Sequence, residues 1–229
     1  MRAVCFASGP AWGAASAQFL REWVCCPRAC RSVCRHDKPR ASHAHALVRA
    51  PVSPCPAGLS HLEHLRCLYL QQNVLKEIRN LDGLGLVTLN LSQNLLTKVT
   101  GLDKLPNLET LNLAKNNIRT VEDIEHLAQC AAVTTLDLSG NKLEDPAVLE
   151  VFKRMPNLCA LYLKGNPMVR QIKHYRKTLV NELPKLTYLD DRPVFELERV
   201  AANAWSAGGH EAEVAARKSP DLDSIKHTR

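Results

Sequence analysis

One eleven-residue pattern, L-x-x-L-x-L-x-x-N-x-L, returns five times in this sequence and constrains its fold more than any other feature. The copies begin at Leu65, Leu86, Leu108, Val133 and Leu158, so that successive copies are 21, 22, 25 and 25 residues apart. Self-similarity at such periods is typical of a solenoid, in which each repeat forms one turn of a coil and buries its apolar side chains only against its neighbours.

The spacing inside one copy predicts a short strand followed by a turn. Leu111 and Leu113 are two residues apart, so both point inward while Thr110 and Asn112 point outward. The turn leaves backbone polar groups inside the coil, and an asparagine side chain offers both donors and an acceptor for them. A helical interpretation fails because the 3-2-3-2 spacing fits no period of 3.6. We therefore predict a structural ladder of five asparagines: Asn73, Asn94, Asn116, Asn141 and Asn166.

The predicted fold class is α/β, a right-handed leucine-rich-repeat solenoid with a parallel sheet on its concave side. The shorter copies leave room on the other side only for a turn or a 3₁₀ coil, whereas the 25-residue copies have room for a helix. Thr120 and Asp123 form a capping pattern for one such helix, and Asp145-Pro146 provides an N-cap and a first-turn proline for the next.

After Asn166-Pro167 the pattern changes to that of a longer helix. Ile172, Tyr175, Leu179 and Leu183 fall at helical spacing, and we expect this helix to cover the open end of the core. A short helix is expected from Glu196 to Trp205, stopped by Gly208-Gly209. The chain thus divides into four predicted segments: a disordered Cys/Arg-rich leader at 1–57, five repeats at 58–168, a C-terminal cap at 169–192, and a short helix with a flexible charged tail at 193–229.

The leader admits several interpretations besides disorder. Arg2 precedes a mildly apolar stretch, which is compatible with a secretory signal, and the excess of arginine over acidic residues is compatible with an organelle transit peptide. Cys26, Cys30, Cys34 and His36 resemble a zinc site, but their spacing is C-x3-C-x3-C rather than paired C-x2-C. A disordered leader without metal is the interpretation that we adopt.

The composition argues against nucleic acid, membrane and enzyme functions. The net charge is +7, yet residues 58–229 hold 22 Lys/Arg against 21 Asp/Glu, so the repeats lack a basic footprint for nucleic acid. No apolar run approaches the roughly 18 residues that a membrane helix needs. The sequence contains no phosphate-binding glycine loop, H-E-x-x-H or G-x-S-x-G. We expect a protein-binding scaffold, not an enzyme, with no catalytic residues, cofactor or metal, in a reducing compartment.

The concave sheet is the candidate partner-binding site, because tyrosine anchors beside small polar residues suit protein recognition. The candidate residues on this face are Tyr69, Thr88, Asn90, Thr110, Asn112, Thr135, Asp137, Tyr162 and Lys164. An alternative site is a basic stripe on the predicted cap helix, formed by Arg170, Lys173, Arg176 and Lys177.

Three stretches carry a resemblance to a known family. They are Val121-Glu-Asp-Ile-Glu-His-Leu127, Gly165-Asn-Pro-Met-Val-Arg-Gln-Ile172, and Leu186-Thr-Tyr-Leu-Asp-Asp-Arg-Pro-Val-Phe195. With the repeats and the Tyr175-Arg176 to Leu189-Asp190 cap, these resemble dynein axonemal assembly factors, which belong to the SDS22-like class of leucine-rich-repeat proteins. The resemblance implies a cytoplasmic protein, associated with the cilium and axoneme, that helps to preassemble outer and inner dynein arms. The partners it implies are dynein-arm subunits, other assembly factors and chaperones.

The chain departs from the family pattern at both ends. Family members have further repeats before the position of Leu65 and a long charged region after Gly208-Gly209, so we expect a truncated or variant form. Two other functions remain open, a generic scaffold or phosphatase-regulating subunit of the same class, and an RNA-associated splicing scaffold. The near-neutral charge of the repeats disfavours the second of these.

Overall fold

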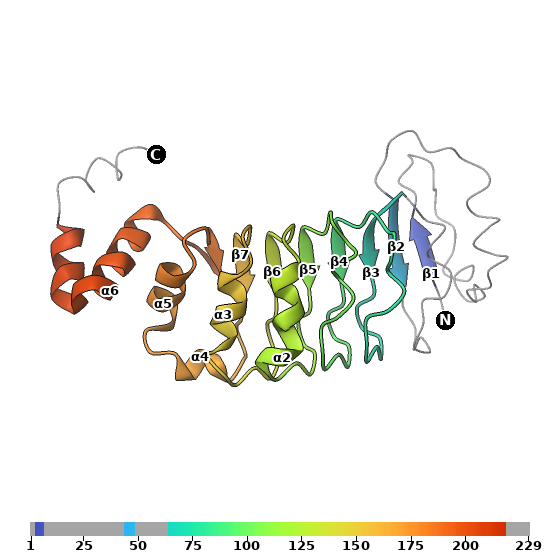
Figure 1. Ribbon diagram of the computed structural model, residues 1–229, viewed down its shortest axis with the longest axis horizontal. Coiled ribbons are helices and arrows are strands. Elements are labelled where there is room, and N and C mark those ends of the chain that lie inside the picture. Colours follow the sequence, from blue (N-terminus) through green and yellow to red (C-terminus); the bar gives the residue numbers. More distant parts are fainter. Residues whose placement is uncertain (1–2, 7–43, 49–63, 219–229) are drawn as a thin grey trace, which may run out of the picture.

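The computed structural model describes residues 3–6, 44–48 and 64–218, and its repeats stack side by side along the long axis (Figure 1). The strands of these residues form one nine-stranded sheet in chain order. Neighbours from β2 to β8 pair in parallel, and the two outermost pairs are antiparallel. The strands are β1 Ala3–Phe6, β2 Ala44–Val48, β3 Leu65–Tyr69, β4 Thr88–Asn90, β5 Thr110–Asn112, β6 Thr135–Asp137, β7 Ala160–Tyr162, β8 Tyr188–Leu189 and β9 Arg192–Pro193.

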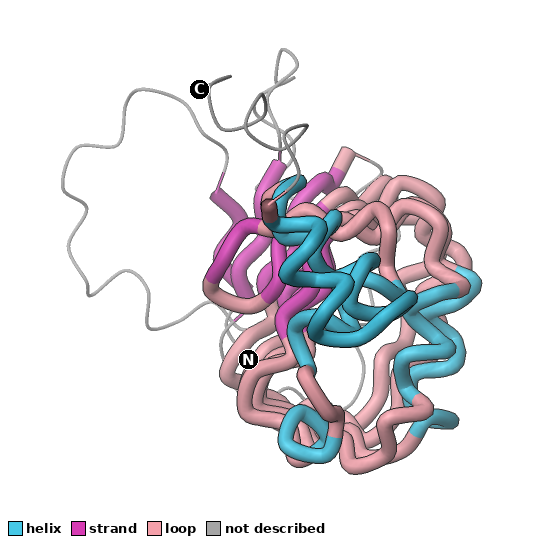
Figure 2. The backbone as a smooth tube through the Cα atoms, turned by 90° about the vertical axis from the view of Figure 1, so that its left-hand side faces the viewer, coloured by secondary structure: helices cyan, strands magenta, loops and turns pink. Residues whose placement is uncertain are grey.

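The helices lie apart from the sheet, on the returning side of the coil and at its C-terminal end (Figure 2). They are α2 Val121–Ile124, η2 Glu125–Gln129, α3 Val148–Lys153, α4 Met168–Gln171, α5 Tyr175–Glu182 and α6 Glu196–Arg217. As the sequence predicts, the Asp123 carboxylate accepts a hydrogen bond from the Thr120 N–H, 2.9 Å away, at the start of α2. The next helix starts later than predicted, at Val148, because the Asp145 carboxylate accepts from the Ala147 N–H and first forms a separate turn.

The core is a column of leucines that passes through every turn of the coil. Leu68, Leu89, Leu111, Leu136 and Leu161 are partners in successive strand pairs, and each is 0% exposed. Since each leucine packs against equivalent leucines above and below it, no single repeat can bury its own apolar side chains.

The asparagines connect consecutive turns through hydrogen bonds inside the coil. The Asn116 side-chain amide donates to the Leu113 carbonyl of its own repeat at 2.9 Å and to the Leu91 carbonyl of the preceding repeat at 3.1 Å. Its oxygen accepts from the Leu96 N–H at 3.1 Å. Asn94, Asn141 and Asn166 repeat all three contacts, and Asn73 donates within its own repeat. The last four of the five asparagine side chains therefore satisfy backbone groups of two turns at once.

The N-terminal side differs from the predicted disordered leader. Strands β1 and β2 fall within 1–57, and β2 pairs in parallel with β3, so they extend the sheet beyond the first repeat. An open sheet edge presents unpaired N–H and C=O groups that any strand can cover, and this pairing leaves no repeat signature in the sequence. The signal, transit and zinc interpretations concern residues outside the described ranges.

The C-terminal cap also differs from the prediction. The single predicted helix is divided into α4 and α5, because His174 between them takes a left-handed conformation with φ of 52°. The first helical segment of α6 ends at Gly208 and Gly209, as the sequence predicts, since neither glycine is helical and φ is 71° and ψ −155° at Gly209, but a second helical segment follows to Arg217 where a flexible tail was expected. Contacts distant in sequence explain the continuation, since the Glu213 side chain is buried against Lys177 and Arg217.

Candidate functional site

The strands present one face of the sheet away from the leucine core, and we call it the open face. Its side chains form columns because the strand pairs are in register. The first column is Cys67, Thr88, Thr110, Thr135, Ala160 and Tyr188. The second column is Tyr69, Asn90, Asn112, Asp137 and Tyr162. The structure therefore brings the predicted face residues together on one surface, with Lys164 following β7 at its C-terminal end.

The middle of the open face is shallow because three side chains of the second column fold onto their own backbone. The side-chain oxygens of Asn90, Asn112 and Asp137 accept hydrogen bonds from the N–H two residues later, at 3.0, 3.0 and 2.9 Å. Such contacts hold each side chain in one orientation. A partner therefore meets a surface whose polar groups are already in place, which lowers the entropy cost of binding.

A tyrosine lies at the N-terminal end of the second column, beside a buried thiol. Cys67, which the alternation places on the open face, is only 8% exposed. The pKa of Tyr69 is raised, mainly because the phenol is partly buried and further by the neighbouring Cys67. Tyr69 is therefore a neutral aromatic group at this end of the face.

Two tyrosines lie together at the C-terminal end of the open face. The ring centroids of Tyr162 and Tyr188 are 5.7 Å apart and their planes are inclined by 43°. The pKa of Tyr162 is raised by burial first, and then by the nearby Tyr188, Asp137 and Asp191. Tyr188 lies in the segment that the sequence predicts only as the cap. Its position immediately before Leu189, like that of Ala160 before Leu161, is the signal that could have placed it on the face.

An aspartate side chain connects the end of β7 to the cap beside these tyrosines. The carboxylate of Asp190 accepts hydrogen bonds from the N–H groups of Leu163 and Lys164, at 2.7 and 3.0 Å, and from the Tyr175 hydroxyl at 2.9 Å. In earlier repeats the N–H equivalent to that of Leu163 donates to a carbonyl of the next strand, as Leu138 does to Tyr162, whereas the N–H equivalent to that of Lys164 donates to a side chain of its own repeat, as Ser139 does to Asp137. Burial of Tyr175, together with Asp190, raises its phenol pKa strongly. The open face thus has a defined C-terminal edge.

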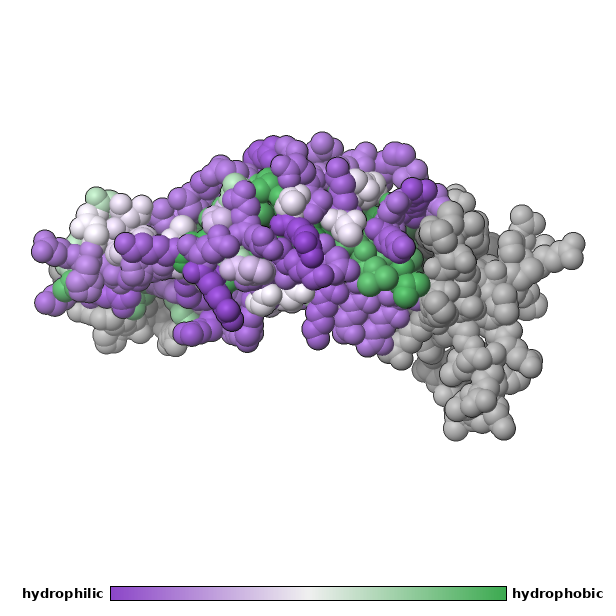
Figure 3. All heavy atoms as spheres, turned by 90° about the horizontal axis from the view of Figure 1, so that it is seen from below, coloured by the Kyte–Doolittle hydropathy of each residue, from purple (hydrophilic) through white to green (hydrophobic). Residues whose placement is uncertain are grey.

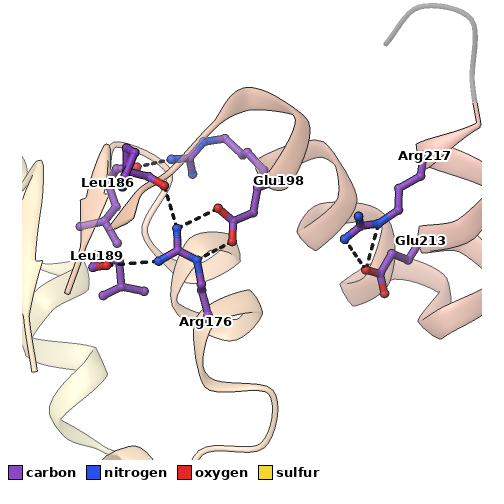
Figure 4. Close-up of polar contacts among 8 residues, drawn as sticks. Arg176, Leu186, Leu189, Glu198, Glu213 and Arg217 are labelled. Atoms are coloured by element: carbon purple, nitrogen blue, oxygen red, sulfur yellow. Dashed lines mark hydrogen bonds and ion pairs between the residues drawn. The ribbon is translucent and has the colours of Figure 1, made fainter. Parts of the chain in front are cut away.

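The alternative basic stripe is not formed as predicted. Arg170 and Lys173 are exposed, but they are separated from α5 by the turn at His174. Arg176 binds the Glu198 carboxylate and donates to the carbonyls of Leu189 and Pro193, as Figure 4 shows in part. Lys177 pairs with Glu213 and lies 5.6 Å from the Trp205 ring centroid. Arg176 and Lys177 therefore hold α6 against the cap.

The remaining described surface offers weaker candidates. Figure 3 shows a mainly hydrophilic side with small apolar areas toward the N-terminal repeats. A shallow depression on the helical side contains His126, but its Nε2 already accepts from the N–H groups of Leu102 and Asp103 at 3.1 and 3.2 Å. In the described ranges no three His, Cys, Asp or Glu side chains are arranged to hold a metal ion. None of the helices of residues 64–218 has both the length and the apolar character needed to cross a membrane.

The repeats identify the family. A family model described as "Leucine-rich repeat" matches residues 81–218. This chain belongs to the leucine-rich-repeat family. The predicted fold class is thereby confirmed, and a solved leucine-rich neighbour agrees: a chain of the Drosophila melanogaster SNF/U2A' complex superposes with a TM-score of 0.52 at 28% identity, covering 69% of this chain and 84% of that one.

Two curated relatives are similar over slightly less than half of this chain. One is "Leucine-rich repeat-containing protein ODA7" of Chlamydomonas reinhardtii, 52% identical over 110 residues, which are 48% of this chain and 26% of that protein. The other is dynein axonemal assembly factor 1 of Homo sapiens, 51% identical over 96 residues, which are 42% of this chain and 13% of that protein. The chain thus matches about a quarter or less of each relative's length, and the resemblance to dynein axonemal assembly factors is confirmed.

Proposed function

We propose that this leucine-rich-repeat chain is a non-enzymatic scaffold for the assembly of axonemal dynein arms. The observation that carries the proposal is the identity of 51–52% to relatives named dynein axonemal assembly factor 1 and ODA7. Partial coverage of those relatives restricts the proposal to the role of the repeats, which is to bind protein partners. In this proposal the chain acts in the cytoplasm, during preassembly of the dynein arms before their delivery to the cilium and axoneme. The partners are dynein-arm subunits, other assembly factors and chaperones.

The open face supports a binding role. Its residues are small polar side chains in fixed orientations, with tyrosines at both ends, and tyrosine is enriched among the residues that dominate interface energies. Neighbouring strands hold every side chain, so little order must be created on binding. The proposed partner-binding residues are Tyr69, Thr88, Asn90, Thr110, Asn112, Thr135, Asp137, Tyr162 and Lys164, to which the structure adds Tyr188.

The test is the double variant Tyr69→Ala/Tyr162→Ala in a tagged full chain expressed in ciliating cells. Truncation of exposed or half-buried side chains costs little stability, so we expect the melting temperature to change by only a few degrees. Capture of dynein-arm subunits is expected to fall about tenfold or more, because aromatic anchors at interface centres contribute roughly 2 kcal/mol or more each. The measurement is quantitative mass spectrometry of the captured proteins.

A matched control removes exposed apolar side chains elsewhere. Val74 and Leu95 are 49% and 42% exposed, and they lie outside the two columns of the open face. Val74→Ala/Leu95→Ala should retain normal capture. If the tyrosine variant also retains it, the open face is not the site, and charge reversal at Arg170 and Lys173 becomes the next test, at low and physiological salt. Recovery of phosphatase catalytic subunits in place of dynein-arm subunits would favour the phosphatase-regulating alternative.

A further inference from the structure

We propose that the C-terminal end of the open face recognises an arginine side chain in a segment of the partner protein. The guanidinium group would lie against the rings of Tyr162 and Tyr188 and bind the carboxylate of Asp137. This inference rests on the proposed function, since it names the chemistry with which the same face selects its partner.

The charge of Asp137 is not needed by the fold. Its carboxylate accepts one hydrogen bond from the Ser139 N–H, at 2.9 Å. In the two preceding repeats Asn90 and Asn112 accept the equivalent bond at 3.0 Å with a neutral amide. An asparagine therefore accepts the same backbone hydrogen bond at this position, and the negative charge of Asp137 is available to bind a cationic group of a partner.

Asp137 is also the one charged side chain in the first two columns of the open face, from β3 to β8. No lysine, arginine or histidine of the described residues lies within ion-pair distance of it. Lys164, which follows the adjacent strand β7, pairs with Asp191 at 2.7 Å. The second carboxylate oxygen of Asp137 thus faces a position that no cation of residues 64–218 fills.

Burial under a partner makes an uncompensated carboxylate costly, because it loses its water without gaining a counter-charge. A partner that covers the open face must therefore bring a cationic donor to Asp137, and a partner that brings an apolar or acidic group is rejected.

The neighbouring rings favour arginine over lysine. Asp137 and Tyr162 are register partners on adjacent strands, and the Tyr162 ring centroid is 5.7 Å from that of Tyr188. A planar guanidinium stacks on an aromatic face while it binds a carboxylate through two N–H groups, whereas an ammonium group does only part of this.

The test uses two pools of 15-residue peptides, degenerate at the flanking positions, with a central arginine in one pool and its neutral analogue citrulline in the other. The pools are passed over the immobilised full chain, and the retained peptides are quantified by mass spectrometry. We expect the arginine pool to be retained about tenfold more strongly, as a charge-assisted contact implies. Equal retention of the two pools by the unmodified chain overturns the proposal.

Asp137→Asn is the decisive variant, since it keeps the backbone hydrogen bond in the form that Asn90 and Asn112 show. It should melt at the same temperature and lose the preference for arginine. Tyr188→Leu should weaken the preference, and Val74→Ala, at an exposed position outside the columns of the open face, should leave it intact. Persistence of the full preference in Asp137→Asn also overturns the proposal.

These results separate the inference from the proposed function. Normal capture of dynein-arm subunits by the Tyr69→Ala/Tyr162→Ala variant contradicts the open face as the site of the proposed function. An arginine preference abolished by Asp137→Asn would still stand in that case, because it is measured with peptides. Loss of dynein-arm capture by the tyrosine variant, without any arginine preference, contradicts only the inference.

Discussion

At the scale of single residues, the asparagines explain how a short strand can be followed by a sharp turn inside an apolar coil. Asn141 is 3% exposed, and its amide donates at 2.9 Å to the carbonyls of Leu138 and Leu113. Its oxygen accepts from the Ile118 N–H at 3.3 Å. Because a buried backbone group without a partner is costly, the side chain stabilises both its own turn and the one before it.

Asn141→Ala is expected to lower the free energy of unfolding by about 1–3 kcal/mol, because two buried carbonyls and one N–H lose a partner. Urea denaturation followed by circular dichroism measures the change. Asn203→Ala, at an exposed position of α6, is the matched control and should be nearly neutral. Similar midpoints for the two variants would contradict the ladder.

At the scale of elements, α6 is joined to the cap mainly by charged side chains. Arg199 donates to the carbonyls of Val180 at 2.9 Å, Leu183 at 3.3 Å and Leu186. Arg176 connects the start of α6 to α5 through Glu198, as Figure 4 shows. Carbonyls at the end of a helix have no partner within the helix, so these arginines satisfy groups that α5 and the following turn leave open.

Arg199→Ala is expected to destabilise the protein by about 1–3 kcal/mol, because those three carbonyls lose the hydrogen bonds that Arg199 donates. The comparison variant is Arg170→Ala, which removes an exposed arginine outside this network and should leave stability within about 0.5 kcal/mol of the original. Thermal unfolding of the two variants at equal ionic strength measures the difference. An equally small effect at Arg199 would show that packing alone holds α6.

The end of α6 should respond to acid. Hydrogen bonds from Lys177 lower the pKa of Glu213 below its usual value of 4.5, with a further contribution from Arg217. A folded-state pKa below the unfolded value means that these ion pairs stabilise the docked helix at higher pH, and that this stabilisation is lost as the pH falls below about 4.5. The segment after Gly209 should then detach from Lys177.

Trp205 reports this change, since its ring lies near Lys177. In a chain with Trp12→Phe and Trp23→Phe, Trp205 is the single tryptophan. Its fluorescence should shift as the pH falls through the pKa of Glu213. Glu213→Gln has no charge to lose and should show no such step; the same step in both proteins would assign the change to another group.

At the scale of the whole molecule, each turn of the coil depends on its neighbours. Leu138 is 0% exposed, its N–H donates to the Tyr162 carbonyl at 2.9 Å, and its carbonyl accepts from Asn141 and Asn166. Stability in a solenoid is approximately the sum of repeat and interface contributions, so strong interfaces make several repeats open together.

Leu138→Ala is expected to cost about 2–5 kcal/mol, because it leaves a cavity in the leucine column. If the described repeats unfold as one unit, hydrogen exchange at the amides of Leu89, Leu111 and Leu161 should accelerate by the same factor. Val74→Ala, on the surface, is the control. Acceleration confined to the strands next to Leu138 would show instead that the repeats open independently.

The repeat pattern was sufficient to predict the leucine-rich-repeat fold and the side chains on each face. Its information is local and periodic: a spacing of two places Leu111 and Leu113 on one side of a strand, and an asparagine at a constant offset meets the same turn in every copy. The columns of the open face follow from that period alone, and they included Tyr162 and Asp137 but omitted Tyr188.

Only the tertiary structure decided where the periodicity ends. The sheet continues into β2, the Asp190 carboxylate replaces a strand carbonyl as the acceptor for the Leu163 N–H, and Glu213 holds the helical segment after Gly209 against Lys177. In the sequence, Arg176 and Lys177 look like part of a solvated basic stripe. In the structure they form ion pairs with Glu198 and Glu213. The physical reason is the same in each case. These contacts join single residues far apart in the chain, so no repeat or local spacing encodes them, and which charges remain free for a partner depends on the assembled fold.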